Sequence, residues 1–189
     1  EYPKVPLFHF LEEAARKYPD HACTIFKGAV ISYREMNEQS NAMAAALVAM
    51  GVKKGDRVGI FMPNLPQFVT AFFGILKAGG VVVAVNPTYP VEEVLTPVND
   101  AGIEVMFTLT RFYNTLKEVR KKSNLKKIII SNLKEALPPV TRVLYTLLKE
   151  EKGGDRLHEI DSSDVWMQDL LKSHAGSPKP NIDVQPDDT

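Results

Sequence analysis

Apolar residues alternate between strand spacing and helix spacing through the middle of the chain, most regularly over Gly55–Tyr89. Arg57–Met62 is an apolar run of strand length. A helix follows that is apolar nearly all round, with Asn64 as its expected N-cap and Pro66 in its first turn. The β-branched run Val81–Val85 comes next and, lacking polar alternation, is typical of a parallel strand covered on both faces. This order predicts a right-handed βαβ unit.

The same rhythm continues as far as residue 132. Two more strands are expected at Ile103–Thr108 and Lys127–Ile130. A helix after Pro90 should be kinked or shortened by Pro97, and Arg111–Lys122 has the spacing of an amphipathic helix. The pattern predicts an α/β fold: a doubly wound, largely parallel sheet with helices on both faces.

The N-terminal part has a different pattern. Leu7–Tyr18 has helical spacing, and two short strands around Lys27-Gly28-Ala29 predict a small hairpin. Ser32 and Glu35 form a capping box, which should begin a helix that runs to Gly51.

The C-terminal part changes character after Asn132. Leu133–Lys152 carries valines and leucines at helical spacing beside basic residues, and Ser163–Leu171 is expected to be a short helix around Trp166. The last residues are rich in Pro, Ser and Asp. We therefore expect an α/β subdomain over residues 1–132, a helical appendage over 133–174 and a linker over 175–189.

Composition narrows the function classes. Lys and Arg together number 23, as do Asp and Glu, so the formal net charge of zero gives no reason to expect a nucleic-acid partner. The single cysteine, Cys23, excludes an internal disulfide, and the N-terminus has no signal-peptide layout. No uncharged apolar run reaches the ~18 residues of a membrane span. These features favour a cytoplasmic location.

Residues whose side chains could take part in catalysis or metal binding are scattered along the chain. The four histidines lie far apart, Glu92-Glu93 suits the first turn of a helix, and Asp161, Asp164 and Asp169 lack the order of a calcium loop. Cys23 lies in an apolar strand, and Arg120-Lys121-Lys122 is interpreted as a solvated face. No phosphate loop, dinucleotide or zinc motif is present. The sequence predicts no catalytic, cofactor-binding or metal-ligating residue in these 189 residues.

Several short segments nevertheless resemble one family in order and spacing. They are Ile31–Met36 (ISYREM), Gly51–Val58, Met62–Asn64 and the run from Leu76 to Pro87. Together they are similar to the N-terminal part of the adenylate-forming, AMP-binding acyl-CoA synthetases. Asn86-Pro87-x-Tyr89, followed by Asn99-Asp100-Ala101-Gly102, resembles the long- or medium-chain fatty-acyl branch.

This resemblance implies an ATP-dependent ligase that forms an acyl-adenylate from a fatty acid and then transfers the acyl group to coenzyme A. In the family, the phosphate loop follows a segment resembling Gln185–Thr189, and the residues for ATP, Mg²⁺ and catalysis come later. The chain is therefore expected to be inactive alone and to pack against the rest of the same polypeptide. The alternative is a stand-alone flavodoxin-like binding or scaffold module without catalysis, because a sheet pattern alone does not fix function. Acyl chain length and oligomeric state stay open.

Two expectations concern surfaces. Apolar surface left uncovered should cause self-association. The helix in Leu133–Lys152 is expected either to pack on its own domain or to make a weak peripheral contact with a membrane.

Overall fold

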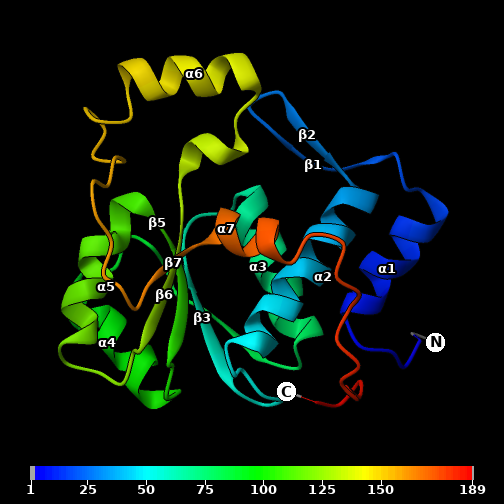
Figure 1. Cartoon of the computed structure of the whole chain (residues 1–189). Helices are drawn as coiled ribbons and strands as arrows, with labels where there is room; N and C mark the ends of the chain where they lie inside the picture. The colour runs from blue at the N-terminus through cyan, green and yellow to red at the C-terminus, as the bar shows by residue number, and fades with distance from the viewer. Residues whose placement is uncertain (1–2, 189) are drawn as a thin grey trace.

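The computed structural model describes residues 3–188. Its centre is a five-stranded sheet in the order β4-β3-β5-β6-β7, with every neighbouring pair parallel (Figure 1). The strands are β3 (Arg57–Phe61), β4 (Val81–Ala84), β5 (Val105–Leu109), β6 (Lys127–Ser131) and β7 (Val165–Trp166). The four strands expected from the apolar runs are confirmed, and they are parallel as predicted.

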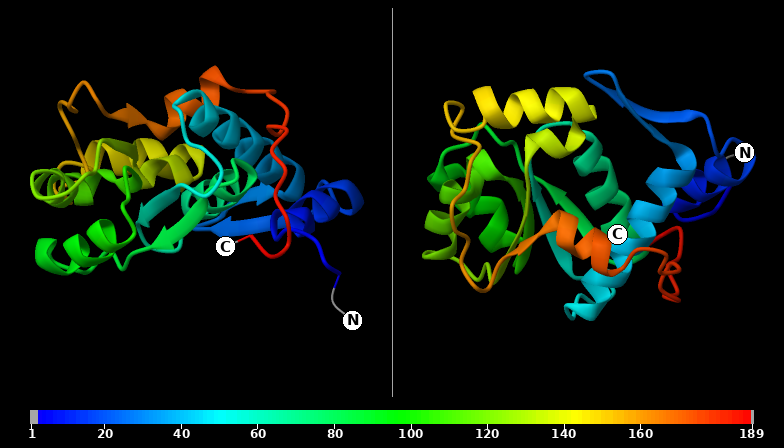
Figure 2. Two further views of the ribbon diagram at one scale, coloured as in Figure 1. Left: turned by 90° about the horizontal axis from the view of Figure 1, so that it is seen from below. Right: turned by 45° about the horizontal axis from the view of Figure 1, so that its top comes forward.

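Helices cover both faces of this sheet, as the doubly wound pattern predicts. On one face, α2 (Tyr33–Ala49), α3 (Pro66–Lys77) and α7 (Met167–Ser173) close a core that contains Ile60 and Phe107. On the other face, α4 (Val91–Asp100) and α5 (Tyr113–Arg120) close a second core around Met106 and Ile128 (Figure 2). Adjacent residues of one strand therefore contribute to different cores, which explains why the strands show no polar alternation.

The start of α3 differs from expectation, and α4 is not shortened. Leu65, not Asn64, is the N-cap of α3, with Pro66 in its first turn. Pro97 does not shorten α4, which continues to Asp100. The following residue, Val98, is 1% exposed and packs with Val94 in the second core, so burial holds the last turn despite the missing N–H donor.

The N-terminal elements lie beside α2 and α3. Helix α1 (Phe8–Lys17) turns Phe8 and Leu11 inward and leaves Leu7 and Phe10 exposed. Strands β1 (Ala22–Phe26) and β2 (Ala29–Ser32) form the expected antiparallel hairpin. The capping box of Ser32 and Glu35 at the start of α2 is confirmed.

The segment after β6 leaves the sheet and then returns to it. It forms the 3-10 turn η2 (Leu133–Ala136) and helix α6 (Pro139–Leu148), which lies at the top of the molecule in Figure 1. It comes back as β7 and α7. The expected single helix over Ser163–Leu171 is wrong at its start, because Val165 and Trp166 extend the sheet by pairing with Ile129 and Ile130.

The C-terminal segment after α7 runs along the N-terminal side of the molecule without helix or strand (Figure 1). Lys179 Nζ lies 2.9 Å from Glu12 of α1, and Lys54 Nζ lies 2.7 Å from Asp188. Lys54 also donates a hydrogen bond to the Asp183 carbonyl. The expected linker is thus held against the domain by ion pairs at both of its ends.

Candidate functional site

The carboxyl edge of the sheet is the place where open α/β sheets bind ligands. Asn132 lies at this edge, directly after β6, and is 4% exposed. Its Nδ2 donates to Glu150 Oε1 at 2.8 Å and to the Asp155 carbonyl at 2.9 Å, while its Oδ1 accepts from the Lys134 N–H at 3.0 Å. The Asn132 side chain thereby holds both ends of the segment that contains α6.

A cavity of about 340 Å³ opens beneath α6 at this edge. Its lining is mostly charged or polar: Asn132, Lys134, Glu135, Thr146, Glu150, Arg156, Leu157, Trp166, Gln168 and Asp169. Glu150 is 3% exposed and accepts from Lys134 Nζ at 2.8 Å, so this buried carboxylate is neutralised by its neighbour. The cavity is polar, and ion pairs neutralise Lys134, Glu135, Glu150 and Arg156 in its lining.

Asp155 lies at the same edge and accepts hydrogen bonds from two side chains. Arg111, in the 3-10 turn η1 (Thr110–Phe112), donates to its two carboxylate oxygens at 2.9 and 3.0 Å. The Tyr145 hydroxyl of α6 donates to the same carboxylate. Burial, and then this hydrogen bond to Asp155, raises the pKa of Tyr145. Asp155 is therefore a structural anchor for α6, and both of its carboxylate oxygens accept hydrogen bonds from within the fold.

A neighbouring cavity of about 330 Å³ is lined by Gln67, whose side chain has an acceptor without a partner. Gln67, at the start of α3, is 6% exposed, and its Nε2 donates to the Asn132 carbonyl at 3.1 Å. Within residues 3–188, Gln67 Oε1 accepts no hydrogen bond. Apolar Ile31, Met167 and Leu171 line the same cavity.

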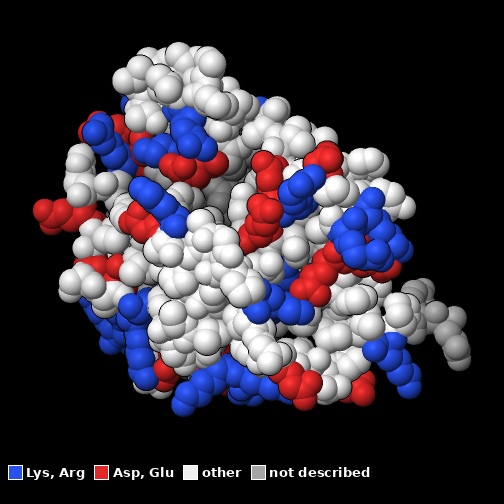
Figure 3. All heavy atoms as spheres, turned by 45° about the vertical axis from the view of Figure 1, so that its right-hand side comes forward, with Lys and Arg blue, Asp and Glu red and all other residues white. Residues whose placement is uncertain are grey.

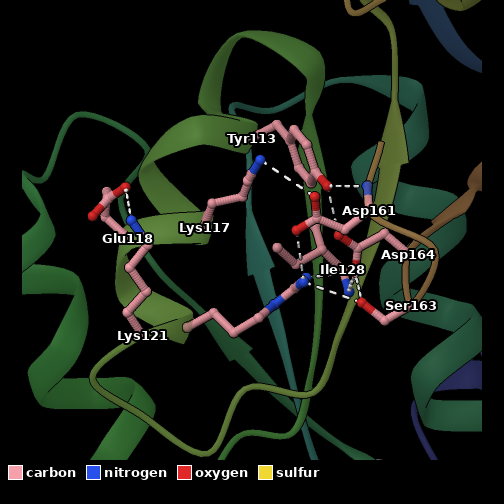
Figure 4. A network of polar contacts seen from close by, with 9 residues as sticks. Tyr113, Lys117, Glu118, Lys121, Ile128, Asp161, Ser163 and Asp164 are labelled. Carbon is pink, nitrogen blue, oxygen red and sulfur yellow. Dashed lines mark hydrogen bonds and ion pairs between the residues drawn. The ribbon is translucent and has the colours of Figure 1, made fainter. Parts of the chain in front are cut away.

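A second polar network lies at the entry to β7 (Figure 4). The Asp164 carboxylate accepts from Arg120 Nη2 at 2.5 Å, from the Tyr113 hydroxyl at 2.7 Å and from the Ile128 N–H at 2.9 Å. Tyr113 in turn accepts from the Asp161 N–H at 2.8 Å. Burial raises the pKa of Tyr113 to about 12. Arg120, interpreted from sequence as part of a solvated face, is instead partly buried and fastens β7 to the sheet.

Lys77, at the end of α3, is the third buried polar centre and is 1% exposed. Its Nζ donates to Asn37 Oδ1 at 2.7 Å, Ser40 Oγ at 2.8 Å and Asn41 Oδ1 at 2.7 Å, all on α2. Burial lowers its pKa to about 8. A depressed amine pKa is typical of catalytic lysines, but here three neutral acceptors use all three ammonium protons. The arrangement joins two helices.

The sequence did not single out these centres, although a signal exists for Lys77. Thr70, Gly74 and Lys77 fall on one face of α3 at i, i+4 and i+7, and Asn37, Ser40 and Asn41 fall on one face of α2. Two polar and small-residue stripes in consecutive helices indicate faces that meet. Asn132 and Asp164 carry no such local signal.

Of the residues considered in the sequence analysis, Arg120, Asp161 and Asp164 come together in the network at β7, and the others lie apart from one another. Glu92 and Glu93 occupy the first turn of α4, as expected, and are exposed. Cys23 is half-buried in β1, where burial raises the pKa of its thiol. Asn86, after β4, accepts from the Thr88 N–H and hydroxyl at 3.0 and 2.8 Å, which makes a tight turn at the carboxyl edge. Over the described range, 3–188, no group of three metal-ligating side chains is present.

Comparison with known proteins shows which proteins this chain is similar to. The family model described as "AMP-binding enzyme" matches residues 11–189. The chain is 39% identical over 132 residues to a long-chain-fatty-acid–CoA ligase of Salmonella typhimurium, a stretch that covers 69% of this chain and 24% of that protein. It is 32% identical over 150 residues to the Bacillus subtilis protein of the same name, which covers 79% and 27%. The chain thus spans about a quarter of the length of these relatives.

Solved structures share the fold. A long-chain-fatty-acid-CoA ligase from Archaeoglobus fulgidus superposes with a TM-score of 0.74 at 18% identity, over 100% of this chain and 34% of that one. A benzoate CoA ligase from Burkholderia xenovorans gives 0.72 at 15% identity, over 95% and 31%. Both likenesses concern the architecture of the sheet and its helices.

Proposed function

The chain belongs to the AMP-binding enzyme family, and from this premise we propose that it is the N-terminal part of a fatty-acid–CoA ligase. The observation that carries this proposal is the 39% identity over 132 residues to a long-chain-fatty-acid–CoA ligase. The whole enzyme would convert a fatty acid and ATP into an acyl-adenylate and pyrophosphate, and then transfer the acyl group to coenzyme A.

Within that enzyme, these residues act as a scaffold. Residues 1–132 form the α/β subdomain, residues 133–174 an appendage that rejoins the sheet through β7, and residues 175–189 a link toward the remainder of the enzyme. The three buried polar centres are consistent with this role, because Asp155, Asp164 and Lys77 use their charges on partners within the fold. None of them has a free site for a reacting atom.

We assign no residue of this chain to catalysis, to the cofactors or to a metal. ATP, Mg²⁺ and coenzyme A belong to the whole enzyme, in which groups outside this sequence hold them. The sequence itself contains no Ser/Thr/Gly-rich phosphate loop with a lysine, so the 189-residue chain should not activate a fatty acid.

The experiment compares two proteins: the 189-residue chain and the full polypeptide encoded by the gene that carries it. Each is incubated with ATP, Mg²⁺, oleate and coenzyme A, and pyrophosphate and acyl-CoA are measured. We expect fatty-acid-dependent release of both products by the full polypeptide and none by the 189-residue chain. Robust pyrophosphate release by the short chain would contradict its inactivity. A full polypeptide that folds but releases no product would favour the stand-alone binding or scaffold module.

A further inference from the structure

Residues 178–188, called the strap from here on, lie against the domain without joining a sheet (Figure 1). Burial alternates along the second half of the strap: Ile182 and Val184 are partly buried, whereas Asp183 and Gln185 are exposed. This is the alternation of a strand that lies on an apolar surface. The apolar side chains of the strap therefore face the domain, and its polar side chains face water.

The backbone of the strap is not bound to the backbone of the domain. Within residues 3–188, no backbone–backbone hydrogen bond joins the strap to the rest of the chain. Its own backbone bonds are local turns, from the Ile182 N–H to the Pro180 carbonyl at 3.0 Å and from the Asp188 N–H to the Gln185 carbonyl at 3.1 Å. The strap can therefore leave the surface without breaking a backbone hydrogen bond of the domain.

Lys54, in the turn between α2 and β3, holds the last part of the strap. Its Nζ lies 2.7 Å from Asp188 Oδ2 and donates to the Asp183 carbonyl, also at 2.7 Å. The hydrogen bond from Lys54 lowers the pKa of the Asp188 carboxyl group. One side chain of the domain thus binds the strap at two positions.

Lys179 holds the first part of the strap against α1. Its Nζ lies 2.9 Å from Glu12 Oε1 and 4.5 Å from the centre of the Phe8 ring, so an ion pair and a cation–π contact act together. Figure 3, which brings this side of the molecule forward, shows Lys and Arg atoms next to Asp and Glu atoms. Ion pairs at a surface contribute little each, so the strap is held by a few contacts that single substitutions can remove.

The strap forms one wall of an apolar crevice of about 320 Å³. Beside it, Ile182 packs on Gly79 at the end of α3, where an added Cβ atom would lie 2.9 Å from Ile182 Cγ2. Departure of the strap would therefore expose Gly79 and open the crevice to water. Its apolar lining includes Phe8, Phe72, Leu76 and Val82 of the domain, and Val184 and Pro186 of the strap.

We propose that the strap is a detachable cover held by Lys54 and Lys179, and that the chain exchanges between this docked state and a released state in which the crevice is open. Segments with few buried apolar contacts and few backbone hydrogen bonds open locally at a lower free energy than the core does. The proposal rests on contacts within the chain and does not depend on ligase activity.

Limited proteolysis of the 189-residue chain by thermolysin measures the released state. Thermolysin cuts before bulky apolar residues, and Ile182 and Val184 face the domain while the strap is docked. A synthetic peptide of residues 173–189 gives the cleavage rate of the free strap, and the ratio of the two rates gives the released fraction when docking is fast. The chain should be cut at these sites at least about tenfold more slowly than the peptide, and before any cut in the sheet.

Two substitutions outside the strap remove its contacts and leave the sequence at the cleavage sites unchanged. Lys54→Met should raise the cleavage rate at Ile182 and Val184 by about fivefold. Glu12→Gln should raise it by about twofold, because Lys179 keeps its contact with Phe8.

The controls are substitutions at the neighbouring positions. Lys53→Met removes an exposed lysine, and Glu13→Gln removes an ion pair within α1, so both should be cut as the wild type is. Far-UV circular dichroism checks that each variant is folded. Cleavage of the wild type at the rate of the peptide, or cleavage of the strap only after the sheet, overturns the proposal. So does an unchanged rate in Lys54→Met.

Discussion

Tyr113 on α5 donates a hydrogen bond of 2.7 Å to Asp164, which lies 51 residues later at the entry to β7. The same carboxylate faces Arg120 and the Ile128 N–H and is fully shielded from water. The bond therefore joins a helix on one face of the sheet to the strand that completes the sheet's edge. The return of the chain after α6 depends on it.

Replacing Asp164 by Asn should destabilise the protein by about 3 kcal/mol, because it leaves the partly buried Arg120 guanidinium without its main partner. Urea denaturation followed by circular dichroism measures the change. Glu118→Gln, which removes an exposed ion pair with Lys121, is the matched control and should cost less than about 1 kcal/mol. Equal losses in the two variants would contradict a structural role for Asp164.

The phenol of Tyr113 reports on the same contact. Its pKa is raised to about 12 by burial, with a further rise from the hydrogen bond and charge of Asp164. Ultraviolet titration of tyrosinate should therefore show a lower pKa for Tyr113 in Asp164→Asn, and the signal is assigned by its loss in Tyr113→Phe. An unchanged titration curve would mean that the carboxylate does not face the phenol.

The sheet could be predicted from the sequence, but these contacts could not. The strands β3, β4, β5 and β6 were predictable because continuous β-branched and apolar runs leave few other structures open. β7 was not, because Val165 and Trp166 are too few to make a pattern and become a strand only by pairing with β6. The Asp164 network depends in turn on that pairing, so its members, 44 residues apart for Arg120 and Asp164, carry no local signal.

The orientation of α6 was equally beyond the sequence. The apolar stripe predicted a helix correctly, although Pro138-Pro139 divides the expected stretch into η2 and α6. Arg142 and Tyr145 decide which side of α6 faces the domain. Arg142 donates to η2, and the Tyr145 hydroxyl donates to Asp155. A hydrophobic pattern locates an apolar face but does not show what covers it.

Lys77 should make stability depend on pH in a defined window. Its pKa falls from 10.5 to about 8 on folding, because burial disfavours the charged amine. Between these two values the unfolded chain holds a proton that the folded chain has lost, so the free energy of unfolding contributed by this group rises with pH. Relative to Lys77→Met, the wild type should gain about 3 kcal/mol across this window.

Denaturation curves of the wild type and Lys77→Met at a series of pH values measure this gain. Lys121→Met, which removes an exposed lysine, controls for the loss of a positive charge. A constant difference between the wild type and Lys77→Met from neutral to alkaline pH would rule out the assigned environment of Lys77.

Two leucines provide a matched comparison of core and surface. Leu47 on α2 is 0% exposed, and Leu147 on α6 is 74% exposed. Leu47→Ala should cost about 2–5 kcal/mol of unfolding free energy, through lost burial and the cavity left behind. Leu147→Ala should change it by less than about 0.5 kcal/mol. A large loss for Leu147→Ala would mean that α6 packs against the domain by its leucine face.

A substitution at Gly74 tests how closely the backbones of α2 and α3 approach each other. A Cβ atom placed on Gly74 would lie 2.7 Å from Met43 Cγ and 2.8 Å from its Cβ, closer than packed atoms allow. Met43 is 0% exposed, so its side chain has no space into which to move. Helix propensity alone predicts that Gly74→Ala stabilises α3 by about 1 kcal/mol. Because the added methyl group must separate the helices that hold Lys77 between them, we expect instead a net loss of about 1–3 kcal/mol in the free energy of unfolding.

The double substitution Gly74→Ala/Met43→Ala frees that space. Its loss of unfolding free energy should be smaller than the sum of the losses in the two single variants, and additive losses would contradict the close contact.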